Sequence, residues 1–324
     1  MQRTPHFEYN KKIAKPVDIP LRMIYDLWRK ITEARSCARL EEKELYIMEM
    51  SDLRKSQSIK ELRSVYDMIS LKGKVALVTG AAGGIGRSTS AAMAELGAKV
   101  MLMDIPPMEE KLKQCVADIR ERYGAEAEYV LGDVSNPASI QSFVDKTVET
   151  FGTIDILHNN AGIGGGKDDW EVPLETWNKA LAVNLTGPLL VAQAVARVMI
   201  AHKHGGSIVT TSSMSGLVIN AGTSYSATKA GVRHMTNKMG IDLAKYGIRC
   251  NSVCYGFIIS GMHENFGRPA EDVAKMYENF DVKTPMGFSG ELSDAVGCVV
   301  FLASDLSRFA TGSTVVVDGG YTTV

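Results

Sequence analysis

The chain has 324 residues, of which 45% are hydrophobic, enough for one large domain and an appended segment. The formal net charge of −1 excludes a global field that would attract nucleic acid or an anionic membrane. The five cysteines are odd in number and scattered, so we expect reduced thiols and no metal site. Charges interrupt residues 1–15 and no uncharged run could span a bilayer, so we expect a cytoplasmic protein without a signal peptide.

Residues 1–72 differ from the rest of the chain, because they are rich in charge and contain no glycine. Apolar stripes with helical spacing predict three helices, at residues 24–31, 45–48 and 59–69. Ser58 and Glu61 are spaced as a capping box for the third helix. We expect a helical N-terminal extension that packs on the main domain or on a neighbouring subunit. Structural support and a roof over the active site both remain open as its role.

A glycine-rich turn follows, between an apolar strand at residues 75–78 and a helix at residues 88–96. An apolar run without alternation is typical of a strand buried on both faces of a parallel sheet. Glycine lets the backbone approach a pyrophosphate closely, and the helix N-terminus offers unpaired N–H groups to the same anion. We therefore predict a dinucleotide-binding loop. Its cofactor-binding residues would be Gly80, Gly84, Ile85 and Gly86.

A second predicted strand, residues 99–103, leads into Asp104. This carboxylate lies 18 residues after Gly86, near the spacing expected for a group that binds the ribose hydroxyls of the cofactor. Its charge repels a 2′-phosphate, and the neighbouring Ile105 offers no charge that would attract one. We predict NAD(H) rather than NADP(H), with Arg87 as the residue that favours the alternative.

From residue 73 to the end, strand and helix patterns alternate. Further strands are predicted at residues 127–131, 154–158, 207–211, 248–253 and 314–317. Further helices are predicted at residues 109–123, 138–151, 174–185, 189–202 and 296–303, and another holds Tyr225 and Lys229 and ends near Tyr246. This alternation predicts an α/β fold, a Rossmann-type doubly wound parallel sheet over residues 73–324.

Several motifs occur in the order typical of one enzyme family. They are Thr79–Gly86 (TGxxxGxG), Asn159–Gly162 (NNAG), Asn184, Ser213, Tyr225 with Lys229 (YxxxK), and Val317–Gly320. On these residues the chain resembles the short-chain dehydrogenase/reductase family over about residues 70–321. Each motif is weak alone, but all of them occur in register. The resemblance implies a nicotinamide-dependent oxidoreductase acting on CH–OH groups and forming homodimers or homotetramers.

The resemblance also assigns four catalytic positions. Tyr225 would be the general acid/base, although an isolated tyrosine has a pKa of about 10, poorly placed for neutral pH. Lys229, one helical turn on, would lower that pKa together with the oxidised nicotinamide, and would hold the nicotinamide ribose. Ser213 would polarise the substrate oxygen, with Ser212 as its rival. Asn184 would hold a water that links Lys229 to solvent.

Further cofactor contacts follow from the same resemblance. They are Asp133 and Val134 at the adenine ring, Asn160 and Gly162 along the cofactor, and Gly256, Ile258 and Ser260 near the nicotinamide amide. The chain departs from the family at Tyr255, which stands where a proline is usual. The fixed φ of proline is lost there. Tyr255 either adds an aromatic wall to the substrate pocket or leaves a looser loop.

The predicted pocket segments are residues 163–169, 214–223 and 255–286, and the last is rich in methionine and aromatic residues with few charges that would bind a sugar or phosphate. They favour a large flat ligand, although an amphipathic lid packed on the body would have the same composition. The predicted substrate residues are Ser213, Met214, Tyr255, Met262 and Phe266. We expect a bulky hydrophobic alcohol or ketone, with a steroid first, because the chain resembles the bacterial 20β-hydroxysteroid dehydrogenases of this family. The alternatives are a 3-oxoacyl thioester reductase, a polyol dehydrogenase and a non-catalytic nucleotide-binding scaffold.

Overall fold

The computed structural model describes residues 59–164, 169–261 and 269–324. The chain divides into two compact units, residues 1–62 and 63–324. The helices predicted at residues 24–31 and 45–48 lie outside the described residues, as does Ser58 of the predicted capping box.

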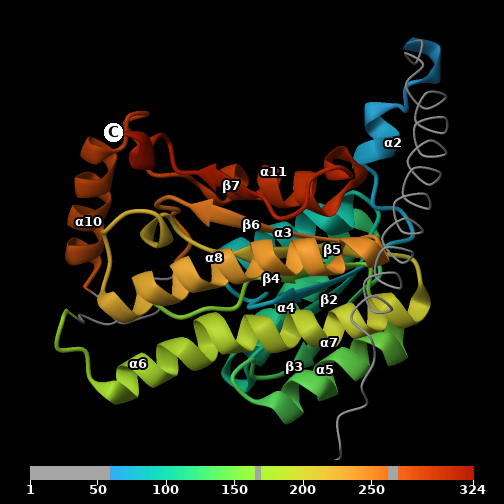
Figure 1. Cartoon of the computed structure of the whole chain (residues 1–324), viewed down its shortest axis with the longest axis horizontal. Coiled ribbons are helices and arrows are strands. Elements are labelled where there is room, and N and C mark those ends of the chain that lie inside the picture. The colour runs from blue at the N-terminus through green and yellow to red at the C-terminus, as the bar shows by residue number, and fades with distance from the viewer. Residues whose placement is uncertain (1–58, 165–168, 262–268) are drawn as a thin grey trace, which may run out of the picture. The chain divides into compact units, whose positions relative to one another are not determined.

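Seven parallel strands form one sheet in the order β3-β2-β1-β4-β5-β6-β7 (Figure 1). Each apolar run predicted as a strand takes its place in it. The strands are β1 (Val75–Thr79), β2 (Lys99–Asp104), β3 (Ala127–Leu131), β4 (Ile156–Asn159), β5 (Gly206–Thr211), β6 (Ile248–Tyr255) and β7 (Thr314–Val317). The predicted Rossmann-type sheet is confirmed.

Helices cover both faces of this sheet. One face carries α3 (Gly84–Glu95), α4 (Glu109–Tyr123) and α11 (Leu292–Ala303), and the other carries α5 (Pro137–Phe151), α7 (Gly187–His202) and α8 (Thr223–Leu243). The other helices used below are α2 (Val65–Ile69), α6 (Leu174–Leu181), the π-helical turn η3 (Ala182–Thr186) and α10 (Ala270–Lys283).

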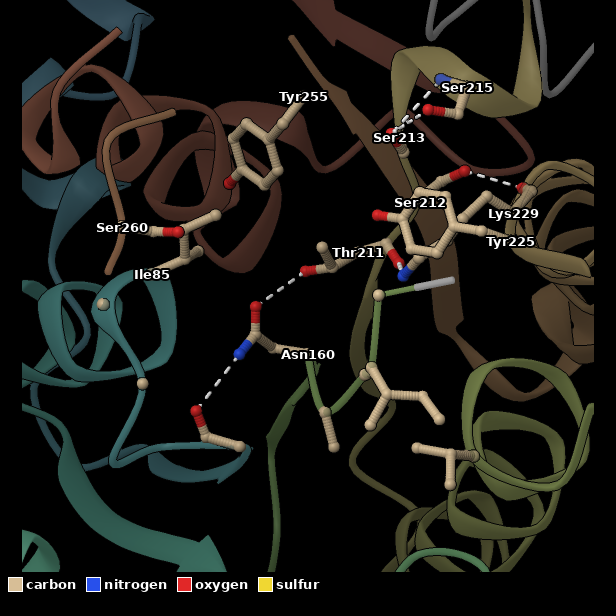
Figure 2. A pocket seen from close by; sticks show the side chains of 18 of the residues that line it. Ile85, Asn160, Thr211, Ser212, Ser213, Ser215, Tyr225, Lys229, Tyr255 and Ser260 are labelled. Carbon is tan, nitrogen blue, oxygen red and sulfur yellow. Dashed lines mark hydrogen bonds between the residues drawn. The ribbon is translucent and has the colours of Figure 1, made fainter. Parts of the chain in front are cut away.

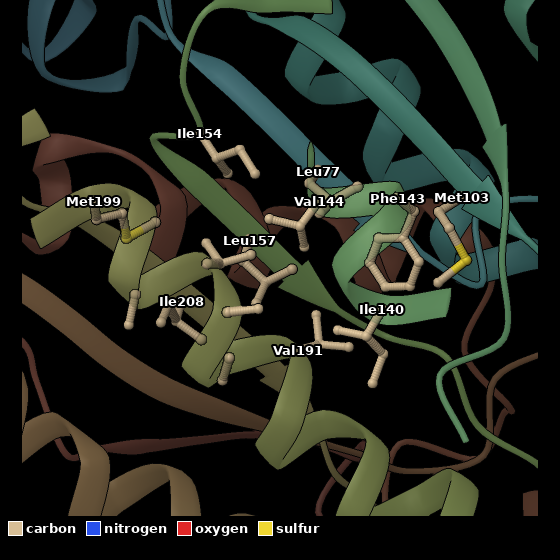
Figure 3. Packing of buried hydrophobic residues seen from close by; sticks show 14 of the residues in the cluster. Leu77, Met103, Ile140, Phe143, Val144, Ile154, Leu157, Val191, Met199 and Ile208 are labelled. Carbon is tan, nitrogen blue, oxygen red and sulfur yellow. The ribbon is translucent and has the colours of Figure 1, made fainter. Parts of the chain in front are cut away.

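Strand β1 shows why its sequence is apolar without alternation. Successive strand residues point to opposite faces, and here both faces are covered by helices. Leu77 packs with Phe143 of α5 in one core (Figure 3). Ala76 and Val78 pack in the other core with Met93 of α3. All residues of β1 are therefore buried.

Two predicted helices differ from the structure. The helix predicted at residues 174–185 ends as α6 at Leu181, and the π-helical turn η3 then joins it to α7. Pro188 has no N–H to donate four residues back, which widens the helix at this point. The single helix predicted at residues 59–69 is wrong, because Ser64 has a ψ of 137° and separates a short 3-10 turn, Ile59–Glu61, from α2.

The run Leu174–His202 is long and apolar enough to cross a membrane by composition alone. Within its most apolar window 50% is buried in the protein, and Val191 and Met199 of α7 belong to the core beneath the sheet. The apolar composition of this run is therefore explained by α7, a core helix whose apolar residues pack on the sheet.

The strand order fixes where a ligand can bind. Neighbouring strands β1 and β4 are the point at which the order reverses, since the chain runs outward to β3 on one side and to β7 on the other. In doubly wound sheets ligands bind in the crevice outside the carboxyl ends of the strands at this point. The glycine loop follows β1 there, and Asn160 follows β4.

Candidate active site

A cavity of about 920 Å³ lies at the carboxyl ends of the strands, near the upper end of the size range of small-molecule sites. Five strands contribute to its lining, through Gly80 after β1, Asp104 of β2, Asn160 after β4, Thr211 of β5 and Tyr255 of β6. The cavity therefore lies where the strand order predicts it.

The glycine loop brings the backbone close to the rest of the site. Gly80 has a φ of +67°, a conformation that favours glycine, and it lines the cavity. A Cβ at Gly84 would lie 2.4 Å from the carbonyl oxygen of Ser260. A Cβ at Gly86 would lie 2.2 Å from the Gly80 carbonyl oxygen, and Gly86 does not line the cavity. Gly86 thus packs α3 against the loop, instead of facing the cofactor site as predicted.

Asp104 lies at the end of β2 and lines the cavity. Its Oδ2 accepts a hydrogen bond from the Ala82 N–H at 3.0 Å, and its Oδ1 accepts one from the Ile105 N–H at 2.8 Å. Burial raises the pKa of Asp104, and the two backbone hydrogen bonds oppose this. Arg87 is exposed and does not line the cavity.

Asn160 ties the loop after β4 to the glycine loop. Its Nδ2 donates to the carbonyl oxygens of Thr79 at 3.2 Å and Gly80 at 3.3 Å. Its Oδ1 accepts a hydrogen bond from the Thr211 hydroxyl at 3.1 Å (Figure 2). All the hydrogen-bonding groups of this amide are thus directed at protein partners, which holds the two loops at a fixed distance.

Tyr225 and Lys229 lie one turn apart on α8, and both line the cavity with Ser213 (Figure 2). The Lys229 Nζ donates to the Thr211 carbonyl oxygen at 3.1 Å and lies 5.6 Å from the centre of the Tyr225 ring. The Ser213 side chain favours the ionised phenol and so opposes the rise in the Tyr225 pKa caused by burial. The Ser212 hydroxyl instead donates to the Lys229 carbonyl oxygen at 2.7 Å. Of the two rival serines, the structure places Ser213 at the tyrosine.

Burial has the largest influence on the pKa values of Tyr225 and Lys229. Burial raises the pKa of Tyr225, and the Ser213 side chain opposes that change. Burial also lowers the pKa of Lys229 to about 8. The lowering of the tyrosine pKa that we predict from Lys229 together with the oxidised nicotinamide concerns the complex with the cofactor, and it stays a prediction.

Asn184 lies on the π-helical turn η3 and is 1% exposed. Its Oδ1 accepts a hydrogen bond from the Ile163 N–H at 2.8 Å, and its Nδ2 donates to the Ile163 carbonyl oxygen at 2.9 Å. It does not line the cavity itself. A Cβ at Gly162 would lie 3.2 Å from Asn184 Oδ1 and 3.4 Å from Lys229 Nζ, so this glycine leaves open the space between the two side chains.

Comparison with known proteins identifies the family. Residues 80–322 match a family model described as enoyl-(acyl carrier protein) reductase. An L-rhamnose 1-dehydrogenase (NAD(P)(+)) of Sphingomonas sp. (strain SKA58) is 40% identical over 253 residues, which are 77% of this chain and 96% of that protein. A 3-oxoacyl-[acyl-carrier-protein] reductase FabG of Thermotoga maritima is 38% identical over 251 residues, 77% of this chain and 98% of that protein.

Among solved structures, the crystal structure of a short-chain type dehydrogenase/reductase from Mycobacterium marinum superposes with a TM-score of 0.74 at 36% identity. The match covers 80% of this chain and 99% of that one. The chain belongs to the short-chain dehydrogenase/reductase family. The predicted family is therefore confirmed, but these relatives do not show the predicted closeness to hydroxysteroid dehydrogenases.

Short-chain dehydrogenases use a nicotinamide dinucleotide, and the residues of this cavity fit one. A Cβ at Gly83 would meet only the Gly80 carbonyl oxygen, at 3.5 Å, so this residue leaves space that a side chain would fill. No side chain caps the N-terminus of α3 at Gly83, so its backbone N–H groups can bind an anion. Asp104, Asp133 and Val134 line the same cavity. We assign them to the adenosine half of the cofactor.

The other predicted cofactor residues also line the cavity. These are Ile85, Asn160, Gly162, Tyr225, Lys229, Gly256, Ile258 and Ser260. They come from loops far apart in the sequence, which the parallel sheet brings together at one edge. As in other short-chain dehydrogenases, a dinucleotide bound here would reach from Asp104 to Tyr225.

For Tyr255 the sequence left two alternatives, an aromatic wall of the substrate pocket or a looser loop. Tyr255 is 3% exposed and pairs with Val317 at the end of β6, so the looser loop is not observed. Its hydroxyl donates to the Ala295 carbonyl oxygen at 2.8 Å, in α11, and lies 3.3 Å from Cys298 Sγ. The residue lines the cavity, but its hydroxyl is engaged by α11 and not free for a substrate.

The substrate side of the cavity is lined mainly by apolar residues. The Phe257 and Phe280 rings stack with centres 4.1 Å apart, and Met214 and Met276 line the same space. Met262 and Phe266, predicted as substrate residues, lie outside the described residues.

Asn220 and Thr211 are among the polar residues of the cavity that the sequence analysis did not name individually. Thr211 stands directly before the Ser212–Ser213 pair, a position that could have suggested a role. Asn220 had a weaker signal, a lone amide in the loop between Ser213 and Tyr225.

Proposed function

We propose that the protein is an NAD(H)-dependent dehydrogenase that interconverts a CH–OH group and a carbonyl group on a polyhydroxylated substrate. The observation that carries the reaction class is the placement of Tyr225, Lys229 and Ser213 in one cavity with the glycine loop. A non-catalytic scaffold would have no need of this set of side chains.

The side chains define the proton transfer. A bound nicotinamide supplies the hydride acceptor or donor. Tyr225 takes the hydroxyl proton of the alcohol during oxidation and returns one to the oxygen during reduction. Ser213, which lines the same cavity as Tyr225, orients the same substrate oxygen. Lys229 holds its ammonium group beneath the tyrosine through the Thr211 carbonyl oxygen, where its charge favours the phenolate.

The preference for NAD(H) rests on Asp104. Its carboxylate is fixed by two backbone N–H groups at the edge of the cavity where the ribose is expected. A 2′-phosphate would meet this negative charge, and the exposed Arg87 does not line the cavity to offset it. One relative carries NAD(P)(+) in its name, so the choice is open to experiment.

The substrate class rests on the relatives. The name of one relative gives it a sugar, L-rhamnose, as substrate, and this supports a polyhydroxylated substrate here. A thioester is less well supported, because the only cationic residues among the described lining residues are Lys179 and Lys229. Two separate lysines are not the basic patch that a carrier protein or coenzyme A would require.

A bulky hydrophobic ketone, such as a 20-oxosteroid, is the second candidate. It is favoured by the stacked Phe257 and Phe280 rings and by Met214 and Met276 in the lining. These side chains could cover a flat apolar ligand. We further propose a cytoplasmic homodimer or homotetramer.

The test is a panel of substrates with both cofactors, followed by the absorbance of NADH and NADPH. L-rhamnose and sorbitol are offered with NAD⁺ or NADP⁺, and a 20-oxosteroid and an acetoacetyl thioester with NADH or NADPH. We expect turnover of a polyhydroxylated compound with NAD⁺. Turnover of the steroid alone would favour the second candidate, and turnover of none would favour the scaffold.

The catalytic assignment is tested by Tyr225→Phe. We expect kcat to fall by about 100-fold or more, because the proton donor is lost, while NADH binding changes less than about twofold. Tyr246→Phe, at a half-exposed position beyond the end of α8, is the matched control and should keep full activity. Unchanged turnover in Tyr225→Phe would refute the acid/base role.

A further inference from the structure

Asn220 stands out among the residues of the cavity. It lies seven residues after Ser213 and five before Tyr225, in the loop that leads into α8. It lines the cavity, and both Oδ1 and Nδ2 of its side chain are buried without a hydrogen-bond partner. Among the cavity-lining residues that the structure describes, no other side chain has both of its polar atoms in this state.

A buried amide without partners costs free energy, and folded proteins pair nearly all such groups. The second asparagine amide of the cavity shows the contrast. Asn160 directs its oxygen and nitrogen at Thr211, Thr79 and Gly80. Elsewhere in the same segment, the Ser213 hydroxyl donates to the Ser215 hydroxyl at 3.2 Å, so each of these groups has a partner in the protein and can still bind a ligand. The protein thus fixes the amide on the cofactor side and leaves the one at Asn220 for another partner.

We propose that Asn220 is the residue that recognises a vicinal diol in the substrate. Its Oδ1 would accept a hydrogen bond from one hydroxyl, and its Nδ2 would donate to the oxygen of the neighbouring hydroxyl. Two adjacent hydroxyls provide the donor and the acceptor that one carboxamide needs. This inference rests on the proposed function, since Ser213 and Tyr225 must hold the reacting oxygen in the same cavity.

The proposal separates the two candidate substrate classes. An apolar ring seated against Asn220 would leave both amide atoms unpaired and dry. A ligand with one hydroxyl would pair one of them, and a vicinal diol would pair both. A site that hydrogen-bonds a substrate hydroxyl discriminates strongly against the analogue that lacks it. The enzyme should therefore prefer diols over otherwise similar alcohols.

The first experiment compares NAD⁺-dependent oxidation of trans-cyclohexane-1,2-diol with that of cyclohexanol. We expect the wild-type kcat/KM to be about 10-fold or more higher for the diol. In Asn220→Leu, which keeps the size of the side chain without its polar atoms, this ratio should fall to about one. Ile219→Ala, at the fully exposed neighbouring position, is the matched control and should keep the wild-type ratio. An unchanged ratio in Asn220→Leu would overturn the proposal.

The second measurement does not depend on turnover. With NADH present, trans-cyclohexane-1,2-diol should raise the Tm of the wild type and of Ile219→Ala, but not that of Asn220→Leu. Without ligand, Asn220→Leu should melt no lower than the wild type, because it removes an unpaired buried amide. A lower Tm there, or a diol shift retained in the variant, would contradict the proposal.

The two proposals fail in different ways. If the wild type oxidises no alcohol but the diol shift depends on Asn220, the proposed function fails and the recognition of diols stands. If the wild type oxidises alcohols without preferring the diol, the proposed function stands and the role of Asn220 is refuted.

Discussion

The glycine loop after β1 and the segment from Ser213 to Tyr225 line the same cavity, but they are built differently. In the glycine loop, backbone groups face the cavity, and side chains such as Asn160 and Asp104 fix that backbone through hydrogen bonds. In the segment from Ser213 to Tyr225, side chains face the cavity, and one of them has no partner in the protein.

This difference corresponds to what each region must bind. A dinucleotide is the same molecule for a whole family, so a backbone cradle that tolerates few substitutions serves it well. A substrate differs between enzymes, so its recognition rests on side chains that can change while the backbone stays the same. The comparison leads us to expect different responses to substitution in the two regions.

Asp104→Asn should give the largest change, because we propose that the choice between NAD(H) and NADP(H) depends on this one side chain. Asparagine can still accept the hydrogen bond from Ala82, but it lacks the charge that repels a 2′-phosphate. We expect the ratio of NADPH to NADH affinity to rise about 100-fold, or ~2.7 kcal/mol. Titration of NADH and NADPH by fluorescence measures it.

Asp118→Asn, which removes an exposed carboxylate from α4, is the matched control and should leave the ratio unchanged. A native preference for NADPH would contradict the role of Asp104 directly.

His158 gives the next largest expected effect. Its Nδ1 lies 2.9 Å from the Thr89 hydroxyl and its Nε2 lies 3.1 Å from the Thr211 hydroxyl, so it links α3 to the end of β5. Burial lowers its pKa to about 3, against about 6.5 in an unfolded chain. Protons therefore bind the unfolded state more tightly, and the stability present above pH 6.5 is lost as the pH falls toward 3.

We expect this single group to cost about 2–3 kcal/mol of unfolding free energy between pH 6.5 and pH 4.5. His158→Gln cannot titrate and should lose that much less over the same range, as measured by urea denaturation at each pH. His234→Gln removes an exposed imidazole as the control. Equal losses in His158→Gln and the wild type would show that His158 does not limit acid stability.

The smallest effects are expected from two glycine substitutions, one in the glycine loop and one in α11. A Cβ at Gly84 would lie 2.4 Å from the Ser260 carbonyl oxygen, so Gly84→Ala must displace the loop that lines the cavity. We expect NADH affinity to fall about tenfold, or ~1.4 kcal/mol. A Cβ at Gly297 in α11 would meet nothing within 4 Å, so Gly297→Ala should instead stabilise the protein by about 0.5–1 kcal/mol.

NADH titration and urea denaturation of both variants provide the measurements. Unchanged NADH binding in Gly84→Ala would show that the close approach of the backbone at this point does not shape the cofactor site.

Particular residues show which features of the site could be predicted from the sequence and which could not. The positions of Tyr225 and Lys229 on one helix turn followed from their spacing, since residues four apart share a helix face. The rivalry between Ser212 and Ser213 could not be resolved by spacing, because it depends on the bond from Ser212 to the Lys229 carbonyl oxygen. Tyr255 was ambiguous for the same reason, because its hydroxyl partner, Ala295, lies 40 residues away.

The depth at which Tyr225 and Lys229 are buried also could not be predicted from the sequence. The motif predicts a cation beside the phenol, and the structure has one, 5.6 Å from the ring centre. How deeply both groups are buried is a property of the packing around α8, and burial is the largest influence on both pKa values.

The sheet, the glycine-rich loop and the order of the motif residues could all be predicted from the sequence. These follow from local patterns: apolar runs, glycines that permit close approach, and helical spacing. The tertiary fold was needed to show that Gly86 packs against its own loop, that Asn184 bonds with Ile163, and that Asn220 lies in the cavity without a hydrogen-bond partner. Local sequence patterns do not report these features, because the burial and the partners of a side chain are set only when the chain has folded and the strands bring their loops to one edge.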